Sequence, residues 1–338
     1  MSCRTLVLLG AVLLSRAANG ASDGLALCAR LENIDERLAC YDELARATES
    51  PAGWPVDSSP TPTHLSEVWK LGAKQASARR LTDIVGYHPT YVISRWTSDP
   101  NEQPTSPAPG REATAPLDLD ANELKFQISF KTELVSRHAF DEIGVTPLLR
   151  HIGIDSVRLW FGYTQRVNWQ AYNTRASRPF RETNYEPEGI LTLGRGNEGD
   201  GFKLINLGLS HQSNGRTGSD SRGWNRLYAQ GGWEWDRLSV LARLWYRIPE
   251  SDVDDDNPDI KNYLGSGDLI TRYQTDRGFV SSLLLRRRFV QLDWATPLMD
   301  MLGAARLHLQ FTSGYGETLI DYNHKQTTLG IGVSFGDW

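Results

Sequence analysis

The chain has 338 residues, a formal net charge of −5 and a mean hydropathy of −0.42. Beyond its first residues, no segment approaches the roughly 20 consecutive apolar residues that a membrane-spanning helix needs. These values exclude a protein that spans a membrane as helices, and averaged hydropathy alone indicates a soluble protein. That conclusion fails if the chain crosses a membrane as strands, because a lumen-facing residue at every second position hides the apolar signal.

The N-terminus has the layout of a secretory signal peptide. In MSCRTLVLLGAVLLSRAANGASDG, a basic Arg4 precedes an apolar stretch over residues 6 to 14, and small residues follow around Gly20. The apolar stretch is too short to span a membrane as a helix. We therefore expect residues 1–20 to be a signal peptide, the mature chain to begin near residue 21 or 22, and its compartment to be oxidising.

Two cysteines remain after removal of that segment, Cys28 and Cys40 in CARLENIDERLAC. No histidine or further cysteine lies nearby, and an even pair in an exported chain favours a disulfide over a metal site. Two free thiols packed in a small helical hairpin are the alternative.

The stretch around these cysteines has helical spacing, because apolar residues recur at threes and fours over residues 25 to 47. The following TESPAGWPVDSSPTPT reads as a flexible linker. We expect residues 21–64 to form a periplasmic helical hairpin and a Pro/Ser-rich linker, and residues 65–338 to form the main domain. A second Pro-rich stretch, over residues 98–116, is also predicted not to pack.

Beyond residue 120 the apolar pattern changes to a period of two. LKFQISFKTEL, LSVLARLWYRI and TTLGIGVSF alternate apolar residues with polar or small ones, which is typical of amphipathic strands. A turn is hardest to place between residues 279 and 296, where no Gly or Pro marks one. About twelve strands are predicted, starting near His88, Leu124, Ser156, Tyr185, Gly201, Trp224, Arg237, Gly267, Phe279, Arg287, Ala304 and Lys325.

Aromatic and charged residues favour a membrane barrel over a soluble sandwich or lectin-like domain, which would also alternate. The chain has 11 Trp and 12 Tyr, many of them near predicted strand ends, and Arg is frequent on the faces opposite the apolar ones. An outer-membrane barrel has aromatic girdles at both interfaces and a polar interior. We therefore predict an all-β fold, a transmembrane antiparallel β-barrel of about twelve strands, preceded by the short helical hairpin.

The segment FKLINLGLSHQS places a histidine and a serine on the apolar face of one strand. Leu207 and Leu209 share parity with His211 and Ser213, so all four face lipid if the leucines do. In the next strand, WNRLYAQ, Asn225 has the parity of its apolar neighbours, and a loop of about ten residues joins the two strands into a predicted hairpin. Asn225 should therefore lie beside His211.

Three polar residues on a lipid face are costly unless they have a function there. An imidazole can activate a serine as a nucleophile, and a neutral amide can fix the tautomer of the imidazole without burying a second charge. Ser213, His211 and Asn225 thus form a candidate triad for a lipid ester. The pattern leaves open that they are solvated residues at headgroup level. A zinc site is disfavoured, because no second histidine has ligand spacing.

The same residues lie in a segment, HQSNGR...SRGWNRLY, that resembles the hallmark of the outer membrane phospholipase A family of Gram-negative bacteria. The resemblance extends from about Tyr87 to Trp338. Further similar stretches are GYTQRVNWQ at residues 162–170, PFRETNYEPE at 179–188, DDNPDI at 255–260 and SGYGETLIDYNHKQT at 313–327.

This resemblance implies an outer-membrane barrel that hydrolyses phospholipid acyl esters at either glycerol position, including those of lysophospholipids, in a calcium-dependent reaction. It implies Ser213 as the nucleophile, His211 as the general base and Asn225 as its orienting partner. The Ser213 backbone amide would hold the oxyanion with help from calcium and its water. We expect phospholipids and a second copy of the chain as partners, and no nucleic acid.

The resemblance also implies a calcium site shared across a homodimer interface. Its ligands are the hydroxyl of Ser221, the main-chain carbonyl of Arg216 and the carboxylate of Asp256 from one subunit, with Ser177 from the other. Oxygen-only ligation with one carboxylate suits calcium better than a transition metal.

Two further positions concern the same interface. Where some relatives carry an acid that is implicated in a second calcium position, this chain has Gly218, with Asp220 close by. Gln165 matches a buried polar residue at the dimer contact of the family, and a lumen or rim glutamine is the alternative.

A passive barrel, either a small pore or a structural membrane protein, is the competing function. A pore needs an open lumen, whereas the predicted inward faces carry bulky side chains such as Arg243, Trp245 and Arg247. These side chains favour a filled interior and chemistry on the outer surface.

Overall fold

The computed structural model describes residues 27–31, 33–48, 63–72, 84–112, 114–195, 199–298 and 304–336. The expected signal peptide and most of the expected linker lie outside these residues. The chain divides into two compact units, Met1–Ser59 and Pro60–Trp338. In the first unit, α3 (Ile34–Thr48) follows a short turn, and Cys28 is bonded to Cys40 with a Cα–Cα distance of 5.6 Å. The predicted disulfide is confirmed.

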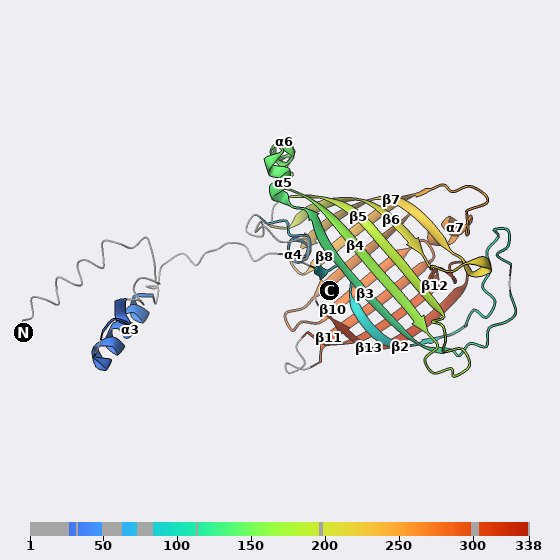
Figure 1. Cartoon of the computed structure of the whole chain (residues 1–338), viewed down its shortest axis with the longest axis horizontal. Coiled ribbons are helices and arrows are strands. Elements are labelled where there is room, and N and C mark those ends of the chain that lie inside the picture. Colours follow the sequence, from blue (N-terminus) through green and yellow to red (C-terminus); the bar gives the residue numbers. More distant parts are fainter. Residues whose placement is uncertain are drawn as a thin grey trace, which may run out of the picture. The chain divides into compact units, whose positions relative to one another are not determined.

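The second unit is a closed antiparallel β-barrel (Figure 1). Within the described residues, thirteen strands form one sheet. β1 and β2 pair in succession with the same strand, β3, so they occupy one position, and β3 pairs with β4 to close a barrel of 12 strands. The strands are β1 (Ile84–Gly86), β2 (Thr90–Thr97), β3 (Asn122–Val135), β4 (Ser156–Trp169), β5 (Glu182–Gly194), β6 (Gly201–Ser213), β7 (Gly223–Trp235), β8 (Leu238–Ile248), β9 (Gly267–Gln274), β10 (Val280–Arg286), β11 (Phe289–Pro297), β12 (Arg306–Tyr315) and β13 (Lys325–Phe335).

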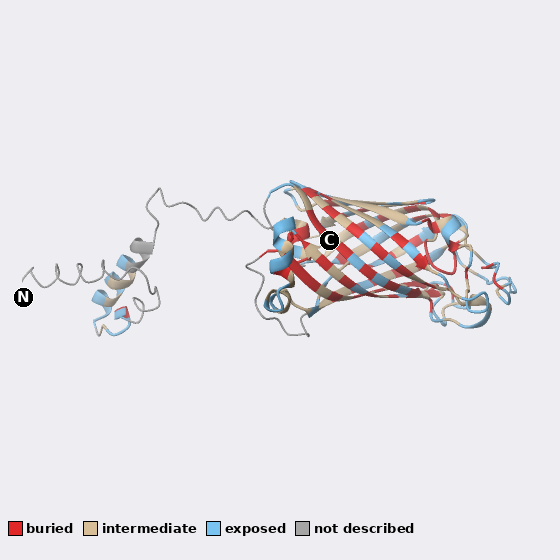
Figure 2. Cartoon of the chain, turned by 90° about the horizontal axis from the view of Figure 1, so that it is seen from above, coloured by how far each residue is buried: buried red, intermediate tan, exposed pale blue. Residues whose placement is uncertain are grey.

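The predicted barrel and its strand pattern are confirmed. Figure 2 shows buried and exposed residues alternating along the strands, as expected when one face points inward and the other toward lipid. The turn that had no Gly or Pro signal consists of two residues, Arg287 and Arg288, between β10 and β11. Neither residue of the turn has a positive φ, which explains why the turn carries no Gly or Pro signal.

Charged side chains fill the barrel interior, where many pair with a side chain of opposite charge. Arg95 contacts Glu123 at 3.0 Å, and Lys125 contacts Glu317 at 2.6 Å. Further pairs are Arg181 with Asp321, Arg226 with Glu186 and Arg243 with Asp268. Buried charges need such partners, and a lumen packed with them does not form an open pore.

A short helical segment closes the interior near one end of the barrel. In α4 (His64–Val68), the backbone amide of Leu65 donates to the carboxylate of Glu234, which points inward from β7. Trp69 follows α4, is buried, and makes an edge-to-face contact with Trp160. The amine of Lys131 lies 3.4 Å from the centroid of the Trp69 ring, so the segment is anchored by apolar packing and by a cation–π contact.

The remaining helices lie in turns and loops. α5 (Arg137–Glu142), α6 (Val145–Leu149) and the 3-10 helix η2 (Arg150–Ile152) connect β3 to β4 at the end of the barrel that also holds α4 (Figure 1). At the opposite end lie the 3-10 helix η3 (Gly218–Asp220) and α7 (Ile260–Leu264). Among the described residues, no helix is long and apolar enough to cross a membrane.

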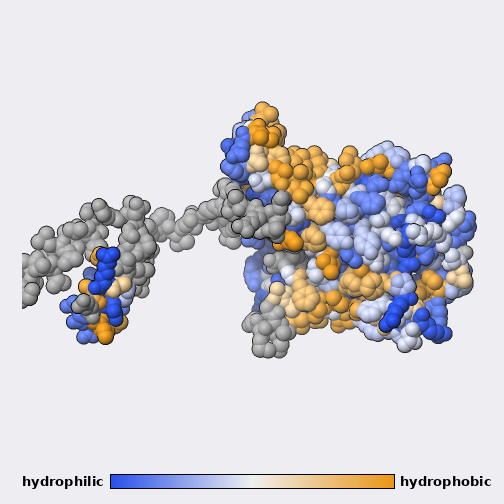
Figure 3. Space-filling model, viewed as in Figure 1, coloured by the Kyte–Doolittle hydropathy of each residue, from blue (hydrophilic) through white to orange (hydrophobic). Residues whose placement is uncertain are grey.

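Hydropathy divides the outer surface along the barrel axis. On the face seen in Figure 3, hydrophobic residues lie over the wall close to α5 and α6, and hydrophilic residues gather toward α7. Most connections at the α7 end are longer than those at the other end, as in outer-membrane barrels, whose outward loops exceed their periplasmic turns. The exceptions are the long β3–β4 connection with α5 and α6 and the two-residue β10–β11 turn. We call this the extracellular end.

The second Pro-rich stretch, over residues 98–116, was predicted not to pack, and that prediction is wrong. The hydroxyl of Ser106 donates to the carbonyl of Asp256 at 2.6 Å, and the side chain of Asn323 donates to the carbonyl of Thr105 at 3.0 Å. Ala108 is buried. The stretch folds against the other extracellular loops, whose groups satisfy its backbone, and its composition alone does not encode those partners.

Candidate active site

The hairpin of β6 and β7 places the predicted site on the outer wall. His211 lies opposite Asn225, and Ser213 lies opposite Gly223. The neighbours with the same parity, Leu207, Leu209 and Leu227, are 44%, 52% and 57% exposed, whereas the intervening Asn206, Ser210 and Gln212 are buried in the interior. The three polar residues therefore share the lipid-facing surface, at the extracellular end of their strands.

The imidazole is held by an amide on the adjacent strand. His211 Nδ1 lies 2.8 Å from Asn225 Oδ1. Because the amide oxygen only accepts, the imidazole nitrogen facing it carries the proton, and Nε2 is left with a lone pair. Ser213 follows two residues along the same face of β6, and its cross-strand neighbour Gly223 has no side chain to cover it: an added Cβ would lie 3.6 Å from that of Ser213.

A carboxylate contacts the NH2 group of the Asn225 amide. Asn225 Nδ2 donates to Glu250 Oε1 at 2.7 Å. Asn225 is paired with Ile248 at the end of β8, and Glu250 lies two residues further along the chain. Burial raises the pKa of the Glu250 carboxyl, while the charge of Arg247 and the hydrogen bond from Asn225 act in the opposite direction. Glu250 was not predicted from the sequence, although its spacing of two from Ile248 indicates that it continues the outward face of β8.

The loop between β6 and β7 is shaped by one buried amide. Asn214 Oδ1 accepts the backbone amides of Arg216 and Arg222, at 3.3 and 3.0 Å, and its Nδ2 donates to the carbonyl of Asp220 at 2.8 Å. Gly223, where β7 begins, donates its backbone amide to Asn257 Oδ1. These contacts fix the path of the loop between Ser213 and Asn225 and tie it to the DDNPDI segment.

Two of the predicted cation ligands meet directly. Ser221 Oγ donates to Asp256 Oδ2 at 2.5 Å, and Arg216 lies in the same loop as Ser221. Hydroxyl, carbonyl and carboxylate oxygens fit a hard cation, although the described residues contain no group of three or more His, Cys, Asp or Glu side chains that could hold a metal. Arg111, from the loop between β2 and β3, contacts the other oxygen of Asp256 through Nε at 3.0 Å. The Arg111 guanidinium therefore pairs with the carboxylate that a bound cation would need.

The two remaining residues predicted for the dimer interface, Ser177 and Gln165, lie in the loop between β4 and β5 and on β4. Ser177 is in the loop between β4 and β5, where its carbonyl accepts the indole N–H of Trp169 at 2.9 Å. Gln165 faces outward on β4 and accepts a hydrogen bond from Tyr163. Across the sheet, Gln165 pairs with Tyr185, and Tyr185 pairs with Ser213. The lumen alternative for Gln165 is thereby excluded, and the residue lies level with the serine on the same side of the wall.

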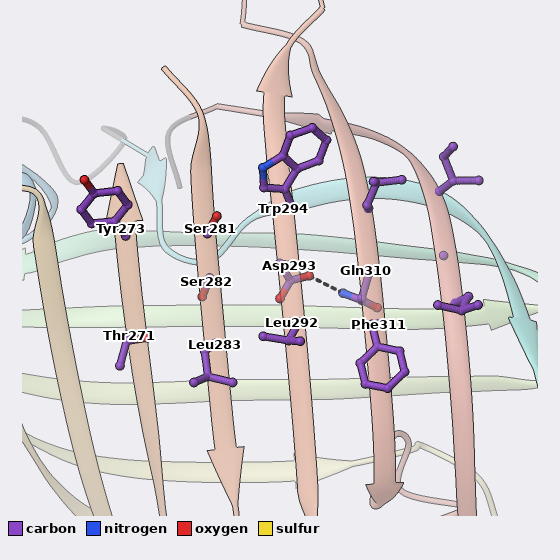
Figure 4. A pocket seen from close by; sticks show the side chains of 14 residues that line it. Thr271, Tyr273, Ser281, Ser282, Leu283, Leu292, Asp293, Trp294, Gln310 and Phe311 are labelled. Atoms are coloured by element: carbon purple, nitrogen blue, oxygen red, sulfur yellow. Dashed lines mark hydrogen bonds between the residues drawn. The ribbon is translucent and has the colours of Figure 1, made fainter. Parts of the chain in front are cut away.

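A separate groove of about 580 Å³ lies on the wall built by β9 to β13, away from β6 and β7 (Figure 4). Leu283, Leu292 and Phe311 contribute apolar side chains, while Gln310 donates a hydrogen bond to Asp293 at 2.8 Å. The groove brings no histidine to a serine. The candidate catalytic residues lie on the lipid-facing surface of β6 and β7 and not in this groove.

Comparison with known proteins identifies the relatives of this chain. A family model described as Phospholipase A1 matches residues 65–335. A putative phospholipase A1 of Neisseria meningitidis is 32% identical over 92% of this chain and 90% of its own length, and phospholipase A1 of Escherichia coli K12 is 37% identical over 74% and 81%.

Solved structures agree with these sequence matches. A calcium-bound dimer of outer membrane phospholipase from Salmonella typhi superposes with a TM-score of 0.62 and 31% identity, covering 78% of this chain and 95% of that one. An E. coli structure with an asparagine replaced by alanine as an active-site mutation has the same TM-score and identity, covering 77% and 95%. With its closed barrel and its outward-facing polar cluster, the chain belongs to the phospholipase A1 family and is a phospholipase of the outer membrane.

Proposed function

We propose that this phospholipase cleaves acyl esters with Ser213 as nucleophile, His211 as general base and Asn225 as its orienting partner. The observation that carries the proposal is the 2.8 Å contact between His211 and Asn225, two residues from Ser213 on the lipid-facing side of the hairpin. Acyl chains of membrane lipids reach such a surface without leaving the bilayer. The substrates are phospholipids and lysophospholipids, at either glycerol position.

In the proposed reaction, His211 Nε2 is the group that accepts and returns protons. Ser213 Oγ attacks the ester carbonyl carbon as its proton moves to His211 Nε2. The imidazolium then gives that proton to the departing glycerol oxygen, leaving an acyl-enzyme. A water attacks the acyl carbon, loses its proton to Nε2, and Ser213 regains a proton as the fatty acid leaves.

The amide of Asn225 suits this apolar setting. Its oxygen accepts the hydrogen bond from Nδ1–H of His211 in every step, so the ring keeps Nε2 free to serve Ser213. A carboxylate in direct contact would place a second charge on the lipid-facing wall, which is costly where water is scarce. The asparagine-to-alanine active-site mutant of the E. coli relative supports an asparagine in this role.

Calcium and a second subunit complete the proposed enzyme. Ser221, Arg216 and Asp256 would hold calcium together with Ser177 of the partner subunit, and the calcium-bound dimer of the S. typhi relative supports this arrangement. When bound, calcium supplies positive charge that stabilises the negative charge developing on the ester oxygen, in addition to the Ser213 backbone amide. Gln165, on the same side of the wall, is assigned to the dimer contact.

The test is replacement of the nucleophile. Ser213→Ala should lower the calcium-dependent release of fatty acid from mixed micelles by at least about a thousand-fold, because the serine is the only group proposed to form the acyl-enzyme. Circular dichroism should show an intact barrel. Thr312→Ala, on the inward face of β12, is the control and should retain activity. A pure Ser213→Ala protein that still releases fatty acid would refute the assignment.

A further inference from the structure

The outer wall carries a glutamate that the mechanism above does not use. Glu250 follows β8, and its carboxylate accepts the side-chain N–H of Asn225 at 2.7 Å. His211, Asn225 and Ile248 form one row across β6, β7 and β8, and Glu250 continues the outward face of β8 beyond that row. We infer that Glu250 is a positioning residue for the proposed triad, acting on His211 through Asn225. This inference rests on the proposed function.

The carboxylate of Glu250 fixes the orientation of the Asn225 amide. An asparagine side chain has two orientations of similar shape, one with the oxygen toward the imidazole and one with the NH2 group toward it. An ionised carboxylate only accepts hydrogen bonds. With Glu250 on one side, the NH2 group of Asn225 faces the carboxylate, and the oxygen is directed to His211.

The orientation of the amide in turn sets the tautomer of the imidazole. With Asn225 Oδ1 as acceptor, the proton of neutral His211 resides on Nδ1, and Nε2 keeps the lone pair that takes the serine proton. The reversed amide would donate to Nδ1 and shift the proton to Nε2, which would then be unable to act as a base toward Ser213. Glu250 therefore excludes the unproductive tautomer.

Glu250 itself lies close to a buried arginine. Its second oxygen lies 3.8 Å from Arg247 Nη2, and the same Arg247 nitrogen lies 2.6 Å from Asp255. The glutamate side chain is 21% exposed. The buried Arg247 guanidinium thus lies within ion-pair distance of a largely buried carboxylate, so the contact to Asn225 is not a pairing of two freely exposed surface groups.

The arrangement also separates the charge from the reacting ring. The imidazolium that forms during catalysis gains the attraction of a carboxylate, transmitted through the polarised amide. The negative charge remains beside Arg247, beyond the end of β8, and does not lie directly against the imidazole. The residue that contacts the imidazole, Asn225, can therefore be neutral, while Glu250 still stabilises the imidazolium by its charge.

The experiment is a double-mutant cycle on kcat and KM, with Glu250→Ala, Asn225→Ala and the double variant. Glu250→Ala should lower kcat about ten-fold with KM within about two-fold, because it affects orientation and not lipid binding. Added to Asn225→Ala, it should cost no further activity, because its effect passes through that amide. Glu250→Gln, whose carbonyl can still accept the N–H, should stay within about three-fold of wild type.

A matched control removes a carboxylate from the same loop. Asp254 bonds to the hydroxyl of Ser251 at 2.6 Å, so Asp254→Ala changes loop charge without touching Asn225 and should keep the wild-type kcat. Wild-type kcat in Glu250→Ala would overturn the inference, as would a double variant that loses the product of the two single effects. Ser213→Ala distinguishes the two failures: if it is inactive while Glu250→Ala is fully active, the triad stands and only the role of Glu250 is wrong.

Discussion

At the scale of single residues, the polar groups around His211 are arranged so that a neutral amide separates the imidazole from the carboxylate of Glu250. Asn225 contacts the ring, and Glu250 contacts Asn225. The groups facing Glu250 are Asn225 from β7, Arg247 from β8, and Asp255 and Asp256 from its own loop. Titration of Glu250 should therefore be visible in catalysis.

The pH dependence of kcat should contain a small step that belongs to Glu250. Burial raises the pKa of this carboxyl above its ordinary value, so the charged form is present above the raised pKa and is lost as pH falls through it. Protonation weakens the acceptor, so kcat should fall by about three-fold, the same loss expected for Glu250→Gln. In that variant the step should be absent. A step of equal size in both proteins would assign it to another group.

A second residue-scale prediction concerns the guanidinium on the proposed calcium ligand. Arg111 pairs with Asp256, and the two side chains are 21% and 17% exposed. Calcium must displace or share this contact, so Arg111→Ala should lower the Kd for calcium by about ten-fold, equivalent to about 1.4 kcal/mol. Calorimetric titration measures this directly. Arg175→Ala, which removes a far more exposed ion pair with Asp118, is the control, and weaker calcium binding by Arg111→Ala would contradict the prediction.

At the scale of elements, the segment with α4 packs inside the barrel and is not part of the wall. Leu65, Trp69 and Leu71 are buried. A Cβ on Gly194 would approach the side chain of Leu71 to 2.6 Å, so the strand requires glycine at that point for the segment to fit. The segment therefore acts as a plug for the interior on the side of α5 and α6.

Removing the central ring of this plug should destabilise the barrel. Trp69→Ala leaves a cavity and removes the ring from Lys131, so the free energy of unfolding should fall by about 3–5 kcal/mol. Urea titration of the protein in detergent micelles, followed by circular dichroism, gives the value. Trp69→Phe keeps an aromatic ring and should lose less. Equal stability of Trp69→Ala and wild type would show that the plug contributes nothing to the fold.

At the scale of the whole molecule, one barrel presents only part of the proposed calcium site. Ser221, Arg216 and Asp256 gather at the extracellular end of the β6–β7 hairpin, and Ser177 lies in a different loop. Calcium prefers about six to eight oxygen ligands, so a single chain would bind it weakly. Two barrels that join on the β4–β6 side would add ligands and would also enclose the half-buried Ser213.

Calcium binding and dimerisation should therefore strengthen each other to the same degree. Ser177→Ala should weaken both by about ten-fold while leaving Ser213, His211 and Asn225 in place. Crosslinking of the detergent-solubilised protein across a calcium titration, alongside its activity, measures the coupling. A wild-type protein that is fully active yet monomeric at saturating calcium would show that one chain completes the site and that Ser177 has another role.

The sequence by itself determined the wall of the barrel and the side on which the polar cluster lies. Alternation with a period of two is a local property of a strand, so the parity of His211, Ser213 and Asn225 with neighbouring leucines was sufficient to place them on the lipid-facing surface. Hairpin pairing of successive strands then brought Asn225 to His211. The disulfide also followed from local information, because only two cysteines remain after the expected signal peptide.

Only the tertiary structure decided which loops and segments meet. Arg111 reaches Asp256 across 145 positions, and Leu65 reaches Glu234 across 169. Such contacts depend on closure of the barrel and on loop packing at its two ends, which no local period encodes. The same holds for Glu250. Its parity with Ile248 could be read from the sequence, but its hydrogen bond to Asn225 depends on how the chain turns after β8.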